Sequence, residues 1–388
     1  MKTGVMCKRL FLFSLLSFIT LSVVFLSGYF VHAWLYPSFP NFPLLSQAFS
    51  ILSDYALNDL PPTPVLEYGM VHGMIQAYGD PYTIFVEPVQ HELETNNLQG
   101  SFGGIGVQLS KDNAGHILLI PFPDSPALHA GILENDRLLA VDNLTIQLDT
   151  PIDDIQAQIR GPEGQSVLIT IGRSPDFQPI QILIERESIP LPSVNWYIAV
   201  DERRLGVIKV NLIAASTPDE VLKATQDLQS RGATHFVLDL RDNGGGLVKT
   251  GVDTARLFLR DGIVIQEQYR GQSVETYRVE QAGQLMDIPL IILINHGTAS
   301  AAEIIAGALQ TQGRAKLIGF PSYGKDTIQF VFDLADGSSL HVTSGHWWIP
   351  GHDQTISGNG LQPDYLIQSD AIGSDPGLAA AIQVLFHP

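Results

Sequence analysis

Ser300 lies in a segment whose pattern could support nucleophilic chemistry. The apolar run Ile291–Ile294 is typical of a buried strand, Gly297 allows a turn, and a helix is predicted from Ala301 onward. Such a corner exposes a side chain beside free backbone N–H groups, so the N–H of Ala301 could stabilise an oxyanion. A serine at this position more commonly only caps the helix, so a nucleophilic role needs a second signal.

A serine nucleophile needs a base, and the sequence offers two candidates. The G-x-S-x-G elbow is absent, and His296, four residues before Ser300, has no obvious orienting acid beside it. Lys325 lies in a glycine turn between two predicted strands, with aromatic and aliphatic neighbours. Burial lowers the pKa of a lysine, and the neutral amine could then accept the hydroxyl proton. An ordinary solvated turn lysine is the alternative.

Three motifs resemble those of the carboxyl-terminal processing peptidases, the Ser-Lys peptidases of family S41 that carry a PDZ domain. The family's G-[ST]-A-S-A-[SA]-E-I segment matches residues 297–304, and its S-[FY]-G-K-x-x-[VI]-Q segment matches residues 322–329. The interval between serine and lysine is 25 positions in the family and here. The family's D-L-R-x-N-x-G-G loop matches residues 239–246. Agreement of three motifs in order and spacing is a strong signal.

The resemblance assigns a role to each matching residue. It implies Ser300 as nucleophile, Lys325 as general base and Gln329 as the residue that assists the lysine. The oxyanion hole would be formed by the backbone N–H groups of Ala301, Gly245 and Gly246. The resemblance extends from the Asp80-Pro81-Tyr82-Thr83 segment to residues 360–364.

The sequence departs from the family pattern at three places. Gly244 replaces the usual proline, and residues 344–349 differ from the expected small-residue, double-tyrosine stretch, so substrate preference could differ. Asp326 replaces the glycine that usually follows the lysine. A carboxylate there would favour the charged lysine, unless its side chain points into solvent.

A β-rich stretch from Gly100 to about Glu187 resembles a PDZ domain. Its Gly103-Gly104-Ile105-Gly106-Val107 segment stands where PDZ domains place the loop whose backbone N–H groups bind a terminal carboxylate. Residues 105–109 would be the edge strand that a peptide extends, and residues 151–160 the helical wall of the groove. Residues 125–132 and 135–141 resemble the family's helix-turn-strand.

The remaining sequence predicts elements that position these motifs. Residues 46–98 are predicted to be helical, with a break at 60–64 and a turn at 79–81. Beyond Pro190, strands alternate with helices, as in an α/β layer. The predicted strands are 205–210, 236–240, 290–294 and 316–319, and the predicted helices are 218–231, 252–260 and 301–312. The expected fold class is an α/β (α+β) peptidase core with an inserted β-rich PDZ domain and an N-terminal transmembrane helix.

The N-terminus predicts a membrane anchor. Residues 10–35 contain no side chain that is charged at neutral pH, and three basic residues precede them. A cleaved signal peptide is the alternative, but residues 31–33 make a poor cleavage site. The basic residues would place the N-terminus in the cytoplasm and the catalytic part outside a cell membrane. The single cysteine, Cys7, leaves none for a disulfide in the exported part.

The sequence thus predicts four parts: a cytoplasmic tail and anchor at 1–36, a helical segment at 37–98, a PDZ domain at 99–187 and a Ser-Lys peptidase core at 188–388. The net charge of −18 argues against nucleic acid as a partner. We expect protein or peptide substrates with free C-termini, and contact with the membrane through the N-terminal helix. No metal or organic cofactor is expected, because the sequence has no H-E-x-x-H, paired cysteines or phosphate loop.

The functional hypothesis is a serine endopeptidase that cleaves exported proteins recognised through their C-terminus. Two alternatives remain from the sequence. One is a catalytically silent PDZ scaffold on a peptidase fold, which Asp326 would favour. The other is an esterase or amidase that uses the same two residues on small substrates.

Overall fold

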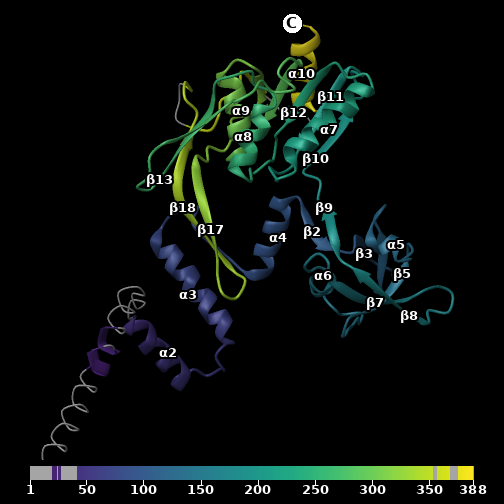
Figure 1. The fold of residues 1–388 in the computed structure, drawn as a ribbon, viewed down its shortest axis with the longest axis vertical. Coiled ribbons are helices and arrows are strands. Elements are labelled where there is room, and N and C mark those ends of the chain that lie inside the picture. The colour runs from purple at the N-terminus through teal and green to yellow at the C-terminus, as the bar shows by residue number, and fades with distance from the viewer. Residues whose placement is uncertain (1–19, 24, 28–41, 353–355, 368–374, 388) are drawn as a thin grey trace, which may run out of the picture. The chain divides into compact units, whose positions relative to one another are not determined.

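The computed structural model describes residues 20–23, 25–27, 42–352, 356–367 and 375–387 (Figure 1). Two compact units divide the chain, Met1–Met70 and Val71–Pro388. Most of the predicted anchor, residues 10–35, lies outside the described residues. Within the described residues, no helix has both the length and the apolar character needed to cross a membrane.

Two helices begin the continuously described part of the chain at residue 42. Helix α2 spans Pro43–Tyr55 and α3 spans Thr63–Tyr78, so the predicted break between them is confirmed. The predicted turn at residues 79–81 follows α3. A short strand, β1 (Ile84–Val86), then precedes α4 (Pro88–Gln99), so the prediction of a helical segment up to residue 98 misses this strand.

The β-rich module has its own sheet and core. Its sheet has the order β3 (Val107–Lys111), β4 (Ile117–Pro121), β5 (Asp136–Val141), β7 (Ser166–Gly172), β8 (Pro179–Glu185), and β6 (Leu144–Thr145) pairs with β5. Two helices belong to the module, α5 (Pro126–His129) and α6 (Ile152–Ile159). Strand β2 (Ser101–Gly104) pairs with β9 (Glu187–Pro190), which brings the two ends of the module together.

A second sheet forms the centre of the peptidase core. Its order is β10 (Val194–Ile198), β11 (Leu205–Val210), β12 (His235–Asp239), β15 (Leu290–Ile294), β16 (Lys316–Gly319), β19 (Tyr365–Leu366). Strand β10 is antiparallel to β11, and the other pairs are parallel. The predicted α/β layer is confirmed.

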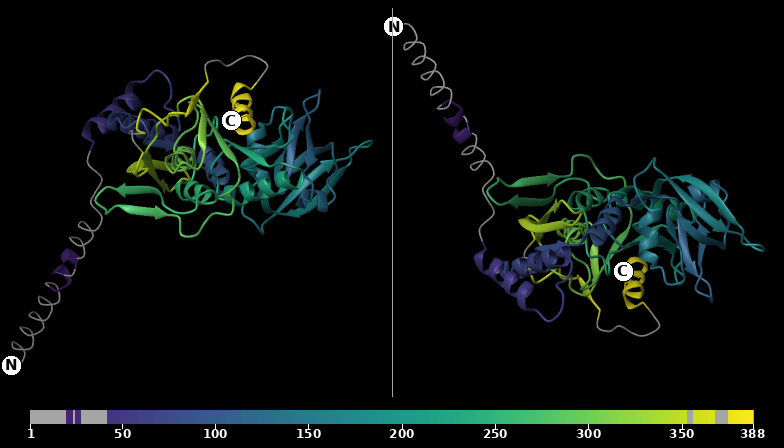
Figure 2. Two further views of the ribbon diagram at one scale, coloured as in Figure 1. Left: turned by 90° about the horizontal axis from the view of Figure 1, so that it is seen from above. Right: turned by 90° about the horizontal axis from the view of Figure 1, so that it is seen from below.

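Helices cover both faces of this sheet, because its central strands are apolar on both sides. Phe236 and Leu238 of β12 pack in the cluster that contains residues of α7 (Thr217–Ser230), α8 (Val248–Arg256) and α9 (Ala301–Thr311). Val237, between them, belongs to the cluster that includes Ala381 of α10 (Pro376–Phe386). Figure 2 shows α10, in yellow, from two further directions.

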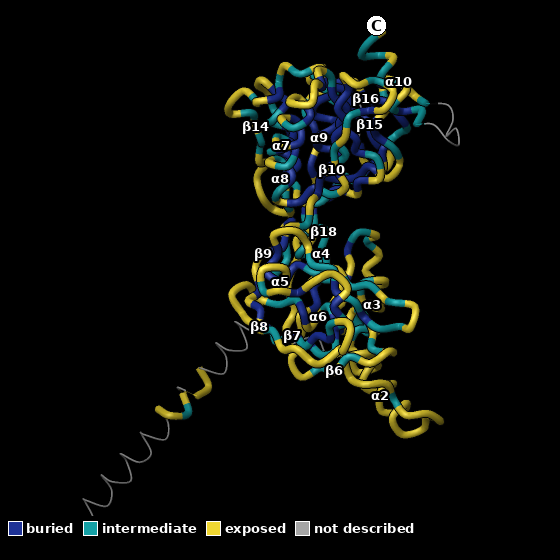
Figure 3. The backbone as a smooth tube through the Cα atoms, turned by 90° about the vertical axis from the view of Figure 1, so that its right-hand side faces the viewer, coloured by how far each residue is buried: buried dark blue, intermediate teal, exposed yellow. Residues whose placement is uncertain are grey.

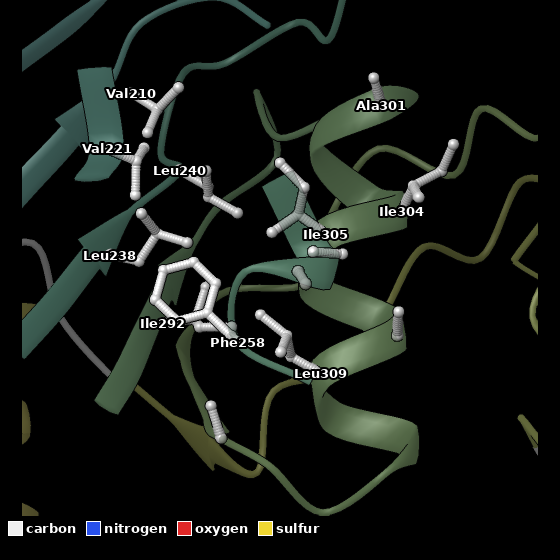
Figure 4. Close-up of a cluster of buried hydrophobic side chains, with 14 of the residues drawn as sticks. Val210, Val221, Leu238, Leu240, Phe258, Ile292, Ala301, Ile304, Ile305 and Leu309 are labelled. Carbon is white, nitrogen blue, oxygen red and sulfur yellow. The ribbon is translucent and has the colours of Figure 1, made fainter. Parts of the chain in front are cut away.

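The first cluster fixes α9 against the sheet. Ile304, Ile305 and Leu309 of α9 are fully buried, and Figure 4 shows them gathered with residues of β11, β12 and β15. The tube around α9 is correspondingly coloured as buried in Figure 3. The segment that begins at Ser300 is therefore held by a rigid helix.

Helix α8 was predicted at residues 252–260 and is observed at Val248–Arg256, so it begins and ends four residues earlier than predicted.

A third sheet was not predicted. Its order is β1, β18 (Ser339–Trp348), β13 (Ile263–Tyr269), β14 (Glu275–Arg278), and β17 (Thr327–Asp333) pairs with β18. Strands β17 and β18 form a long antiparallel hairpin (Figure 1). This hairpin begins directly after Lys325 and therefore positions the candidate base.

Candidate active site

Ser300 occupies a strained corner between β15 and α9. Its backbone has φ 53° and ψ −121°, a region that costs an L-residue free energy and that is held by the surrounding structure. The Ser300 N–H donates to Oε2 of Glu303 at 2.8 Å, and the side chain is 8% exposed. The predicted strand-turn-helix corner is present, and it combines strain with local hydrogen bonding.

The glycine loop that follows β12 lies against this corner. A Cβ atom on Gly245 would stand 2.8 Å from Cβ of Ser300 and 3.1 Å from the N atom of Ala301. Gly245 also has φ 102°, so both space and backbone conformation require glycine. The structure therefore brings together the two loops that the sequence suggested for the oxyanion hole.

The N–H groups of these loops differ in availability. Within the described residues, the Ala301 N–H and the Gly246 N–H have no hydrogen-bond acceptor. The Gly245 N–H instead donates to Oδ1 of Asn243 at 2.9 Å. An unpaired N–H beside a serine can bind a developing oxyanion, and in this arrangement the N–H of Ala301 fits that task. The oxyanion roles of Gly245 and Gly246 stay predictions.

Asn243 and Thr298 fix the two loops to each other. Nδ2 of Asn243 donates to the carbonyl of Val210 at 2.8 Å. The backbone carbonyl of Asn243 accepts from the Ala299 N–H at 2.9 Å. The Thr298 hydroxyl donates to the carbonyl of Leu240 at 2.8 Å. Both side chains are fully buried. These bonds preorganise the corner before any substrate arrives.

Lys325 lies in a partly buried position that suits a base. Burial lowers the pKa of its ammonium below the ordinary value, and the negative charge of Asp80 partly opposes this shift. Nζ donates to Oε1 of Gln329 at 2.9 Å. Within the described residues, no hydrogen bond joins this amine to the Ser300 hydroxyl. The structure therefore pairs Lys325 with Gln329 as predicted, while the serine-lysine contact stays a prediction.

Glu303 links the two candidate catalytic segments and was missed as a functional residue. Besides the Ser300 N–H, its carboxylate accepts from the Ser322 hydroxyl at 2.5 Å, the Gly324 N–H at 2.7 Å and the Lys325 N–H at 2.9 Å. It is fully buried, and burial raises its pKa, although these four hydrogen bonds favour the carboxylate. The S-x-x-E pattern of a capping box was the signal that could have identified it.

Tyr82 is a second residue whose role was not predicted. Nε2 of Gln329 donates to the Tyr82 carbonyl, and the centroid of the Tyr82 ring lies 5.3 Å from Nζ of Lys325. In the sequence, Tyr82 only marked where the family resemblance begins. Its separation of more than 240 residues from Lys325 left no local signal for this contact.

Asp326 and His296 each contact a residue outside the candidate dyad. The Asp326 carboxylate lies 3.7 Å from Nδ1 of His346, and the charge that raises the Lys325 pKa is that of Asp80. His296 is exposed, and its ring stacks on Phe320 with 5.9 Å between centroids. Neither residue supports the alternative to which it was assigned.

The β-rich module contains a small groove at the predicted peptide-binding position. Its lining comes from the end of β2, the following loop, β3 and the C-terminal part of α6, and consists of Phe102, Ile105, Gly106, Val107, Leu109, Gln156, Ile159 and Arg160. Within the described residues, the N–H groups of Ile105 and Gly106 have no acceptor. Ile105 as a whole residue is fully buried, at the base of this groove.

Comparisons with known proteins match both parts. A family model of peptidase family S41 matches residues 204–367, and a PDZ domain model matches residues 123–173, which excludes the 103–107 loop. The chain is 35% identical to a carboxyl-terminal-processing protease of Picosynechococcus over 313 residues, 79% of this chain and 74% of that one. A protein of the same name from Synechocystis is 32% identical over 311 residues, covering 79% and 72%.

Among solved structures, the photosystem II D1 C-terminal processing protease is similar to this chain, with 25% identity, a TM-score of 0.47 and coverage of 87% and 90%. The identity to curated relatives over most of both chains is what decides the assignment. The chain belongs to peptidase family S41, among the carboxyl-terminal processing serine peptidases.

Proposed function

We propose that the enzyme cleaves proteins with a Ser-Lys dyad formed by Ser300 and Lys325. The neutral amine of Lys325 accepts the proton of the Ser300 hydroxyl, and the oxygen attacks the carbonyl carbon of a peptide bond. The N–H of Ala301 stabilises the oxyanion, and Gln329 orients the amine. The observation that carries this proposal is the partly buried Lys325 amine, hydrogen-bonded to Gln329, in a segment joined to the serine by Glu303.

The rest position of the lysine is compatible with this mechanism. The charged Nζ carries three hydrogens, and the neutral amine carries two hydrogens and a lone pair. Among the described residues, Nζ makes one hydrogen bond, to Gln329, so it can still bond to the serine. Catalytic hydrogen bonds are often absent in ligand-free enzymes and form in the substrate complex. A change of the Lys325 side-chain rotamer would then bring the amine to the serine.

The second part of the proposal concerns substrate choice. The unpaired N–H groups of Ile105 and Gly106 suit a terminal carboxylate, and the aliphatic and aromatic residues among the mixed polar and apolar lining of the groove suit the last side chain of a peptide. A module that binds a C-terminus delivers long protein chains, which argues for an endopeptidase rather than a small-substrate esterase. We also propose that residues 10–35 anchor the enzyme in a cell membrane with its catalytic part outside.

Digestion of an intrinsically disordered protein tests the dyad. Ser300→Ala and Lys325→Arg should each abolish cleavage, because one lacks the nucleophile and the other carries a guanidinium that cannot give up its proton. His296→Ala is the matched control and should retain activity. Loss of activity in His296→Ala together with retention in Lys325→Arg would disprove the proposal.

A further inference from the structure

The Asp80-Pro81-Tyr82-Thr83 segment forms a rigid turn beside the catalytic lysine. The Asp80 carboxylate accepts from the Thr83 N–H at 2.9 Å, the Thr83 hydroxyl at 2.5 Å and the Tyr82 N–H at 3.4 Å. Thr83 Oγ1 in turn accepts from the N–H of Thr343 on β18 at 3.2 Å. The turn is therefore fixed both internally and to the sheet that carries Gln329.

This turn presents two groups of Tyr82 to the base. The Tyr82 carbonyl accepts from Nε2 of Gln329, which leaves Oε1 of the same amide facing Nζ of Lys325 at 2.9 Å. The Tyr82 ring centroid lies 5.3 Å from Nζ, within the range of a cation–π contact. One residue thus sets the orientation of the amide and places a π face beside the amine.

The other charged and titratable groups near Lys325 act on its amine through charge or contact other atoms, whereas Tyr82 places a ring beside the amine. Burial lowers the pKa of the Lys325 amine, and the charge of Asp80 raises it. Burial and, in turn, the charge of Lys325 lower the pKa of His341 on β18. Glu303 of α9 binds the backbone of Lys325, not its amine. On the lysine's own loop, the Asp326 carboxylate lies 3.7 Å from Nδ1 of His346, and besides burial, both Tyr323 and the charge of Asp326 lie close enough to raise the pKa of the Tyr82 hydroxyl.

We propose that Tyr82 is a positioning residue of the peptidase reaction, whose ring stabilises the Lys325 ammonium at the moment that proton transfer creates it. When the Ser300 O–H bond breaks, its proton forms a new N–H bond on Lys325, and a positive charge appears at Nζ. The quadrupole of the ring attracts this charge and has little attraction for the neutral amine. The inference rests on the proposed role of Lys325 as the base.

The contact between Tyr82 and Lys325 should affect the pH profile of kcat/KM, whose acid limb reports the pKa of the base in the free enzyme. Replacing the ring by an aliphatic chain, Tyr82→Leu, removes a group that favours the charged lysine, so the pKa of Lys325 falls. The acid limb should therefore move to lower pH by about half a unit to one unit. The plateau should fall several-fold, because the ammonium is no longer stabilised as it forms.

Two further variants isolate the cause. Tyr82→Phe retains the ring and the carbonyl, so its acid limb should stay within about 0.3 unit of the wild type, a small part of a ring-sized shift. Asp80→Asn keeps a hydrogen-bond acceptor in the turn but removes the charge, and should also move the limb to lower pH. Tyr323→Phe removes a hydroxyl close to Tyr82 but leaves the Tyr82 ring in place, and should leave the limb unmoved.

The full-length enzyme and one peptide substrate are used for all profiles, with circular dichroism as the check of folding. A Tyr82→Leu limb that is unmoved, or that moves to higher pH, would overturn the proposal and leave Tyr82 as a packing residue. Should Tyr82→Leu not fold, an unmoved limb in Asp80→Asn together with a shifted limb in Tyr82→Phe would overturn it equally. Retained activity in Lys325→Ala would instead refute the base assignment, which is a separate outcome.

Discussion

At the scale of single residues, Glu303 fixes the position of the Ser300 segment relative to the Lys325 segment. Its carboxylate is the common acceptor for N–H groups at Ser300, Gly324 and Lys325 and for the Ser322 hydroxyl. A buried acceptor with four donors cannot be removed without leaving those donors unpaired. Glu303 is therefore a positioning residue that acts through the backbone of both catalytic segments.

Glu303→Gln should lower kcat strongly and change KM little. The amide retains one acceptor oxygen but turns an NH2 group toward N–H donors, which should displace the Ser300 corner. We expect a loss of about 100-fold in kcat, comparable to the removal of one oxyanion donor. Steady-state kinetics check this result. Near-normal kcat would show that the corner is held by Asn243 and Thr298 alone.

Glu303→Ala tests the energetic side of the same residue. Four donors would lose their buried acceptor, so we expect the free energy of unfolding to fall by about 3 kcal/mol or more. Urea denaturation measures this change. Glu94→Ala, on α4, is a control at a partly exposed glutamate and should change stability by less than about 0.5 kcal/mol.

Asp326 should be dispensable for the chemistry. Its carboxylate is oriented toward His346, and it is not among the groups that shift the pKa of Lys325. Asp326→Asn is therefore expected to keep kcat/KM within about threefold of the wild type, because the contact that it loses is a 3.7 Å pair with an exposed histidine. An increase of tenfold or more would show that this carboxylate restrains the lysine, as the silent-scaffold alternative assumes.

At the scale of elements, the glycine loop after β12 must approach the start of α9 without side chains. Gly245→Ala would place a Cβ atom 2.8 Å from that of Ser300 at a φ of 102°. We expect a loss of about 100-fold in kcat/KM, because the oxyanion corner would be displaced.

Gly244→Ala is the matched control for this substitution. A Cβ atom at Gly244 has no neighbour within 4 Å, and the backbone there has no positive φ. Activity should therefore remain within about twofold of the wild type, as for a surface substitution. Equal losses in both variants would mean that the loop acts only through its overall flexibility.

The elements also show how far the sequence could predict the structure. The four inner strands β11, β12, β15 and β16 and helix α9 were predictable, because short apolar runs between helices leave few alternatives, whereas the edge strands β10 and β19 were not predicted. The sheet formed by β13, β14, β17 and β18 was missed. Its strands are half exposed, and the two pairings that join its hairpins and β1 into one sheet, β1 with β18 and β13 with β18, link segments far apart in the chain. Local periodicity does not report such pairings.

In the candidate site, too, residues in local motifs could be proposed from the sequence, and contacts between distant segments could not. Ser300, Lys325 and Gln329 could be proposed from the sequence because each lies in a local motif with fixed spacing. Tyr82 contacts Lys325 only through the fold, so no local pattern could assign its role. Which N–H group of the glycine loop is free also depends on the Asn243 side chain, whose orientation is a property of the folded loop.

At the scale of the whole molecule, the proposed function assigns recognition and cleavage to different parts of the chain. A peptide with a free C-terminus should give a kcat/KM at least about tenfold higher than the same peptide with an amidated terminus, because charge-assisted hydrogen bonds to the 103–107 loop are lost. The bond that is cleaved should not change. Measurement of the two rates and of the products by mass spectrometry checks both statements.

Gly103→Val provides the control for this measurement. A Cβ atom at Gly103 would lie 2.1 Å from the Gly161 carbonyl oxygen, so the loop must shift. The difference between the free and amidated peptides should then disappear. A ratio near one in the wild-type enzyme would remove the carboxylate-binding role and leave the peptidase assignment intact.

The central claim for the whole enzyme is that the amine at position 325 is the base that activates Ser300. Chemical rescue tests it most directly, because Cys7 is the only native cysteine and can first be replaced by serine. Lys325→Cys in that background should be inactive, and alkylation with bromoethylamine should restore activity by rebuilding an amine of lysine length. An active Lys325→Cys enzyme, or no recovery after alkylation that mass spectrometry shows to be complete, would contradict the account.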